Sequence, residues 1–156
     1  MATITTNTSG TQPVIEVSTY GNMANAITIP FLQDVTITNS TGIYSYTTFS
    51  DADTRKLSTP ADNEISTNIV LDIDAYFGTT GIAGNNAAEL GLVNLSGQKD
   101  LIYFNIYYAG NVANAHYASG QGFITSLAPT VAPENPIWIS PLTIAVDGGF
   151  TDNEVP

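Results

Sequence analysis

The chain has 156 residues, with 14 acidic and 3 basic side chains and a net charge of −11 at neutral pH. Only 11% of its residues are charged, less than half of the roughly 25% found in an ordinary soluble domain. Three basic residues are too few to neutralise nucleic-acid phosphates, and an anionic membrane would repel the chain. The absence of cysteine excludes disulfides, zinc–thiolate sites and cysteine nucleophiles.

The length predicts a single domain. Residues 1–12 are mostly Thr, Ser, Asn and Gly, which predicts a flexible N-terminal arm, and they lack the basic and apolar segments of a signal peptide. We expect one β domain at 13–151 and a short C-terminal tail at 152–156. A compact monomer of this mass would expose roughly 7,500 Å², or about 440 Å² per charge. Such sparse charge indicates a surface covered by uncharged polar residues or by other protein.

Thr, Val, Ile, Tyr and Phe dominate between the two ends, and these residues favour strands. Pro141 lies inside the last expected strand, so that strand should be an edge strand or bulged at this point. Turn-forming clusters separate the segments. Strands are expected at Val14–Tyr20, Ile27–Phe31, Asp34–Asn39, Ile43–Phe49, Leu101–Tyr108, Gln121–Leu127 and Ile137–Val146.

The longest alternation of apolar and polar residues runs from Asn63 to Phe77. This period of two predicts a single strand of about 15 residues with one apolar face. Its polar face would carry Glu64, Asp72 and Asp74. The sequence has no run of about 18 apolar residues, so no membrane-spanning helix is expected.

One segment has helical spacing instead. Residues Asn86–Ser96 predict a single helix of about three turns, capped by Asn85 or Asn86. Gly97 could end this helix. Gly91 lies inside it, where a glycine costs about 1 kcal/mol relative to alanine.

The residues that could carry catalysis do not form a recognisable constellation. His116 is the only histidine and has no Gly-x-Ser-x-Gly nucleophile motif to serve, so we interpret it as structural. Asp72 and Asp74 would lie roughly 7 Å apart on a strand, a spacing that could suit acid–base chemistry or a cation. A solvated polar face explains the pair more simply. We expect no enzyme activity.

A calcium loop is suggested by Asp51-Ala-Asp-Thr-Arg55, but its sixth position is Lys56, where the sharp turn of such a loop needs glycine. We therefore expect no metal site. No phosphate-binding glycine loop is present either, and no cofactor is expected.

The C-terminal third resembles a known family. Its motifs, and the order of elements over about 35–151, are similar to those of the tail tube proteins of long-tailed bacteriophages. The matching segments are Gly120-Gln-Gly-Phe-Ile-Thr-Ser-Leu127, Ala132-Pro-Glu134, Thr143-Ile-Ala-Val-Asp-Gly148 and Phe150-Thr151.

This resemblance implies a mainly β fold, a β-sandwich or half-barrel with one flanking helix. It implies a structural protein of the virion, assembled in the host cytoplasm. Six copies would form a ring, and stacked rings would form a hollow tube through which DNA is ejected. The implied partners are other copies of the chain and tape-measure, tail-tip and tail-terminator proteins. Open sheet edges could join between neighbouring copies, and the two ends of the chain could bridge rings.

In such a tube the acidic charge would have a use. A lining of Lys and Arg would bind DNA phosphates, whereas an acidic lining repels them within roughly 8 Å at physiological salt. Glu64, Asp72 and Asp74 are the candidate lumen residues. The same face could instead lie on the outer wall.

Two alternatives remain open. A head-decoration protein, or another β protein of the virion, would form closed oligomers instead of open tubes. A carbohydrate-binding β-sandwich would be a monomer with a row of exposed aromatic side chains.

Overall fold

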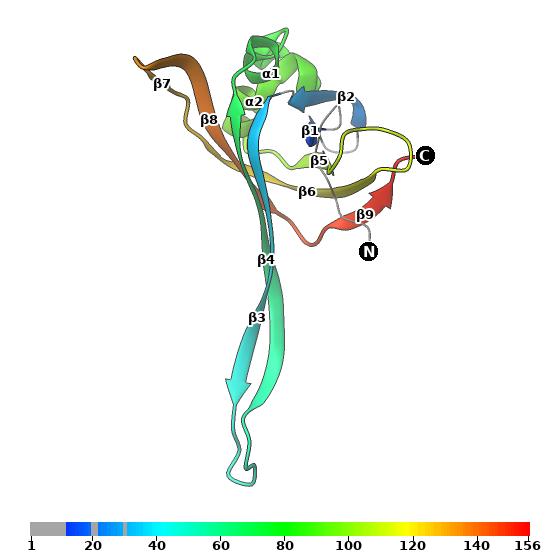
Figure 1. The fold of residues 1–156 in the computed structure, drawn as a ribbon, viewed down its shortest axis with the longest axis vertical. Helices are drawn as coiled ribbons and strands as arrows, with labels where there is room; N and C mark the ends of the chain where they lie inside the picture. The colour runs from blue at the N-terminus through cyan, green and yellow to red at the C-terminus, as the bar shows by residue number, and fades with distance from the viewer. Residues whose placement is uncertain (1–11, 20–21, 30) are drawn as a thin grey trace.

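The computed structural model describes residues 12–19, 22–29 and 31–156, so the expected N-terminal arm, except for Gln12, lies outside the described residues. The fold is one antiparallel sheet with two α-helices (Figure 1). The helical elements are α1 (Ile73–Phe77), the 3-10 helix η1 (Gly81–Ala83) and α2 (Ala87–Gln98). The strands are β1 (Val14–Thr19), β2 (Asn22–Ile29), β3 (Leu32–Tyr46), β4 (Arg55–Val70), β5 (Ile102–Tyr107), β6 (His116–Leu127), β7 (Thr130–Ala132), β8 (Asn135–Val146) and β9 (Thr151–Glu154).

The strands are hydrogen-bonded in the order β2-β1-β5-β6-β8-β4-β3, with β7 beside β8 and β9 beside β6. This confirms the predicted mainly β fold, and the single sheet fits the half-barrel form of that prediction better than two stacked sheets. After Val146 the chain turns, and β9 pairs with the first part of β6. Most of the segment expected as a C-terminal tail is therefore part of the sheet.

The core lies between the helices and one face of the sheet. Ile15, Ile65 and Phe104 are fully buried, and each is followed in its strand by a less buried polar residue. They belong to the same apolar cluster as Leu92 and Leu95 of α2. The alternation that predicted the strands therefore also determines which face of the sheet the helices cover.

A long hairpin formed by β3 and β4 projects away from this core (Figure 1). The inner part of β4, Asn63–Val70, also pairs with β8, whereas among the described residues Arg55–Asp62 pairs with β3 alone. The segments Asp34–Asn39 and Ile43–Phe49, predicted as two strands, lie largely on the single strand β3. The register shifts between Thr41 and Ile43, as expected for a β-bulge.

The prediction of one strand from Asn63 to Phe77 is wrong beyond Val70. Its alternation continues, but pairing with β8 ends at Val70 and the chain turns into α1. The side chain of Asp72 accepts a hydrogen bond from the backbone N–H of Ala75 at 3.1 Å, so Asp72 is the N-cap of the helix. Gly78, with φ 75°, ends it.

Helix α2 confirms the predicted helical segment and its cap, but the single regular helix is wrong, because Gly91 has non-helical backbone angles (φ 75°, ψ 166°) and kinks it. The side chain of Asn86 accepts a hydrogen bond from the N–H of Glu89 at 3.1 Å, and the Glu89 carboxylate in turn accepts one from the N–H of Asn85 at 2.8 Å. The expected end at Gly97 is wrong by two residues, because Lys99 is the C-cap in the left-handed conformation.

Pro141 lies on β8 opposite Asn68 of β4, while pairing with β6 ends at Leu142. The proline thus falls where β8 has lost one of its two neighbours, which is where a missing N–H is tolerated in a sheet. Among the described residues, no helix is long and apolar enough to span a membrane.

Candidate assembly surfaces

The face of the sheet opposite the helices is polar and carries carboxylates. Register pairs such as Thr38 with Glu64, and Glu16 with Asn105, place these side chains on that face. Glu16, Glu64 and Asn105 each lie between two buried residues of their own strand. We call this surface the polar face; it comprises Glu16, Asp34, Thr36, Thr38, Glu64, Ser66, Asn68, Asn105 and Thr143.

The polar face holds only one of the three predicted lumen residues. Glu64 is exposed there, whereas Asp72 caps α1 and Asp74 lies in its first turn. The premise that all three share one strand face is therefore wrong. Glu16 and Asp34 were missed, although Glu16 lies between Ile15 and Val17 in its predicted strand, and Asp34 begins the alternation of the next one.

Hydrogen bonds fix two of these carboxylates. Asp34 accepts from the side-chain amide of Asn68 at 2.8 Å and from its backbone N–H at 3.1 Å. The hydroxyl of Tyr107 donates to Glu16 at 3.2 Å. Burial, more than any other cause, raises the pKa of Tyr107 above its usual value of 10.0, so this hydroxyl stays a donor at neutral pH.

Basic side chains are absent from the polar face. Arg55 and Lys56 lie on the projecting hairpin and Lys99 lies at the end of α2, and these are the only three basic residues of the sequence. The named residues of this face therefore present carboxylates, hydroxyls and amides, and the partly exposed ring of Phe123 lies in the same register row as Glu64. The carboxylates repel phosphate groups.

The end of the β3–β4 hairpin is apolar and exposed. Phe49 in its loop is fully exposed, and Ile43, Tyr44 and Leu57 each expose more than half of their surface. Tyr44 lies directly opposite Leu57 and so shares its face. These exposed apolar side chains make the end of the hairpin a candidate interaction surface.

An ion pair stabilises the hairpin loop. Arg55 Nε donates to Asp51 at 3.0 Å and Arg55 Nη2 donates to the other carboxylate oxygen at 3.1 Å. These bonds, followed by one from the Thr48 hydroxyl, hold the pKa of Asp51 below its ordinary value of 3.8. The segment that resembled a calcium loop is thus a turn whose first carboxylate binds a guanidinium group.

A second apolar surface lies where α1 meets the β7–β8 hairpin. It is a groove of about 490 Å³, within the size range of small binding pockets. Ile73 is 76% exposed, Phe77 56% and Trp138 52%. We call it the α1 groove; it is lined by Leu71, Asp72, Ile73, Tyr76, Phe77, Val93, Pro129 and Trp138.

The residues considered for catalysis are apart from these surfaces or have other roles. His116 is exposed at the start of β6, opposite Glu154 of β9. The Asp72 carboxylate caps α1. In the part of the chain that the structure describes, no three His, Cys, Asp or Glu side chains are grouped to hold a metal.

Solved structures with the same fold come from tails and related particles. The chain matches one in the tail of an empty GTA particle with helical C6 symmetry, at a TM-score of 0.67 and 13% identity over 96% of this chain and 99% of that one. A chain in the virion of the native gene transfer agent (GTA) particle matches at a TM-score of 0.60 and 12% identity, over 96% of this chain and 99% of that one. A chain in the six-fold symmetrised baseplate of the anti-feeding prophage (AFP) matches at a TM-score of 0.54 and 9% identity, over 97% of this chain and 98% of that one.

These similarities extend over nearly the whole chain, and at such identities they establish the fold. The expected resemblance to phage tail proteins is thereby confirmed at the level of the fold. By sequence, neither a family model nor a curated protein matches the chain.

Proposed function

We propose that the chain is a structural subunit of a phage or phage-like tail, and that it forms the tail tube. In this proposal six copies close into a ring, and the rings stack into a hollow conduit for DNA. The observation that carries the proposal is the full-length match to a chain in a tail with C6 symmetry. The sparse charge of the chain also supports it, because the surface of a lone monomer would usually carry more.

The sheet offers a way to close the ring. Among the described residues it ends in β2 on one side and β3 on the other, and an unpaired edge strand is a template for pairing with another chain. If β3 of each copy pairs with β2 of the next, the sheets join into one closed barrel. The contact is head-to-tail, which closes a ring when the rotation between copies allows it.

The polar face is the surface that we propose for the lumen. Its carboxylates at Glu16, Asp34 and Glu64 would repel DNA phosphates, and no cation on this face would hold them. The proposal keeps Glu64 from the sequence-based candidates. Asp72 and Asp74 do not lie on this face, and their position on α1 points to a different role.

Electron microscopy of the purified, concentrated protein tests the assembly. Rings in end views and striated hollow tubes in side views are the expected result. A monomer at every concentration, seen both by microscopy and by sedimentation, would contradict the proposal. Closed trimers or pentamers that never stack would favour a head-decoration protein instead.

A further inference from the structure

The turn between β8 and β9 has the sequence Asp147-Gly148-Gly149. Among the aspartates of the chain, Asp147 alone is followed by glycine, and no asparagine is. All three residues of the turn are exposed, and no atom lies within 4 Å of the Cβ position of Gly148. Because glycine has no side chain, the backbone nitrogen of Gly148 is open to the neighbouring carboxyl group.

We propose that Asp147 and Gly148 form a spontaneous isomerisation site, at which the folded chain slowly converts Asp147 to isoaspartate. The backbone nitrogen of Gly148 bonds to Cγ of Asp147 while the Cγ–OH bond breaks. The hydroxyl group leaves with the amide proton as water, and a five-membered succinimide ring remains.

Water then opens this ring at one of its two carbonyl carbons. Opening at Cγ restores aspartate, whereas opening at the α carbonyl carbon leaves the main chain running through Cγ of Asp147. The second product is isoaspartate, which adds one methylene group to the main chain. One water is released and one is consumed, so the mass of the chain is unchanged. The reaction involves a single chain and does not depend on assembly.

Gln121 of β6 restrains the reacting carboxyl group. The backbone N–H of Asp147 donates to the carbonyl of Gln121 at 2.8 Å, and Gln121 Nε2 donates to the Asp147 carboxylate at 3.2 Å. The contact between the two side chains is exposed to solvent, so it can open without disturbing the core. We therefore assign Gln121 as a positioning residue that slows the isomerisation.

The turn is attached to the base of the β3–β4 hairpin by a buried amide. Asn63 is only 4% exposed, and its Nδ2 donates to the carbonyl of Gly148 at 3.0 Å. Its Oδ1 is buried and has no hydrogen-bond partner among the described residues. An added methylene group beside Gly148 would displace this carbonyl and leave the Asn63 amide without its acceptor, which is costly inside a protein.

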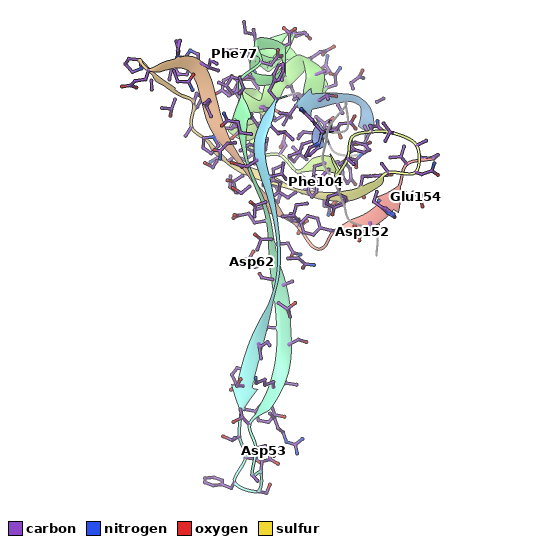
Figure 2. The ribbon with its side chains drawn as sticks, in the orientation of Figure 1. Asp53, Asp62, Phe77, Phe104, Asp152 and Glu154 are labelled. Atoms are coloured by element: carbon purple, nitrogen blue, oxygen red, sulfur yellow. The ribbon has the colours of Figure 1, made fainter. Side chains whose placement is uncertain are left out.

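Strand β9 follows directly after the turn. The ring of Phe150 meets the buried ring of Phe104 edge-on, and β9 then pairs with β6. Figure 2 shows Asp152 and Glu154 of β9 at the edge of the body, beside Phe104. Since β8 and β9 hold both ends of the turn, a longer main chain cannot satisfy both sets of contacts. We expect isomerisation to loosen β9.

Peptide mapping of the stored protein tests the site. The folded full chain is kept at 37 °C and neutral pH, and samples are digested with a protease that cleaves before aspartate but not before isoaspartate. Cleavage before Asp147 should decline with time, and the mass of the peptide that spans it should not change. Cleavage before Asp100 and Asp152 should persist, because both are exposed but precede leucine and asparagine.

Three outcomes would overturn the proposal. Undiminished cleavage before Asp147 would show that the site does not react. Equal losses before Asp147, Asp100 and Asp152 would show that the glycine is irrelevant. A loss before Asp147 only in denaturant would show that the folded turn protects the carboxyl group.

Two variants test the assigned roles, with isoaspartate measured by an isoaspartyl methyltransferase. Asp147→Glu should abolish its formation, because glutamate would have to close a larger ring. Gln121→Ala should accelerate it roughly two- to tenfold, the factor expected when one ordinary hydrogen bond is lost. Gln98→Ala, at an exposed position on α2, should leave the rate unchanged. Equal rates in the two alanine variants would overturn the restraining role of Gln121.

Hydrogen exchange tests the effect on β9. In the isomerised protein the backbone amides of Thr151–Glu154 should exchange faster than in fresh protein. The amides of β5, Ile102–Tyr107, should keep their protection, since this strand is buried between β1 and β6. Unchanged exchange in β9 after isomerisation would overturn the predicted loosening.

Discussion

Gly78 and Gly91 touch backbone to backbone where the end of α1 meets a kink in α2. Both residues have φ of 75°, and a Cβ atom on Gly91 would overlap the backbone of Phe77 and Gly78. The N–H groups of Thr79 and Thr80 donate to the carbonyls of Ala88 and Glu89 at 3.1 and 3.0 Å. Gly91, which the sequence marks as a weakness of the helix, is what allows α1 to pack against α2.

Gly91→Ala should therefore destabilise the fold by about 2 kcal/mol or more, because it adds both backbone strain and overlap. Gly97→Ala is the matched control, since it lies in the same helix with nothing within 4 Å of its Cβ position. It should be neutral or stabilising by up to about 1 kcal/mol. Denaturant unfolding measures the free energy of unfolding of both variants. Equal losses in Gly91→Ala and Gly97→Ala would contradict the close packing at Gly91.

Phe104 covers a glycine on the neighbouring strand. It is fully buried, pairs with Gly120 of β6 and meets the ring of Phe150 edge-on, with 6.1 Å between ring centroids. Phe104→Ala should cost about 3–5 kcal/mol because it leaves a cavity. Phe123→Ala, on the same strand as Gly120 but 41% exposed, should cost much less. Thermal unfolding distinguishes the two, and similar losses would contradict this role.

The hairpin loop should respond to acid through Asp51. Arg55 holds the pKa of this carboxylate below 3.8, so the ion pair stabilises the loop above that pH and is lost as the pH falls through the lowered pKa. Arg55→Gln should raise the pKa of Asp51, as followed by carboxyl NMR. Lys56→Gln removes the same charge from the next residue, on the other face of the strand, and should shift it less. Equal shifts would show that general charge, and not the hydrogen-bonded pair, sets this pKa.

The sequence predicted those parts of the fold where one face is buried. Strands such as Leu101–Tyr108 and the helix capped by Asn86 follow from alternation and capping. Helix α1 was missed because Ile73, Ala75 and Phe77 continue the alternation of β4, although Asp72 followed by Gly78 are signals of a short capped helix. The distinction depends on where β8 stops pairing, which is a long-range property.

The surfaces that we assign to assembly were harder to predict. The outer half of the hairpin has no buried face, so residues such as Arg55–Asp62 show no periodicity that could mark a strand. The α1 groove brings Trp138 beside Phe77, and no local pattern connects segments so far apart. Glu16 and Asp34 could have been assigned to the polar face, because Glu16 lies between two apolar residues and Asp34 begins the alternation Asp34-Val35-Thr36-Ile37, both in strands that were predicted.

The lumen proposal rests on the sign of the charge on the polar face. Thr36 and Glu64 are both exposed there, and in a ring each substitution is repeated in every copy. Thr36→Lys with Glu64→Lys would therefore surround the conduit with cations. Gln98→Lys with Asp100→Lys makes the same change in charge at the end of α2, where both residues are also exposed.

If the polar face lines the tube, tubes of the Thr36→Lys, Glu64→Lys variant assembled with short duplex DNA should retain it on sedimentation at low salt. Wild-type tubes and the Gln98→Lys, Asp100→Lys control should retain much less. The retained DNA should be released steeply as salt rises, because each neutralised phosphate adds to the salt dependence. In particles, the same variant should slow DNA ejection at low salt. Equal retention by the two lysine variants would place the polar face outside the conduit.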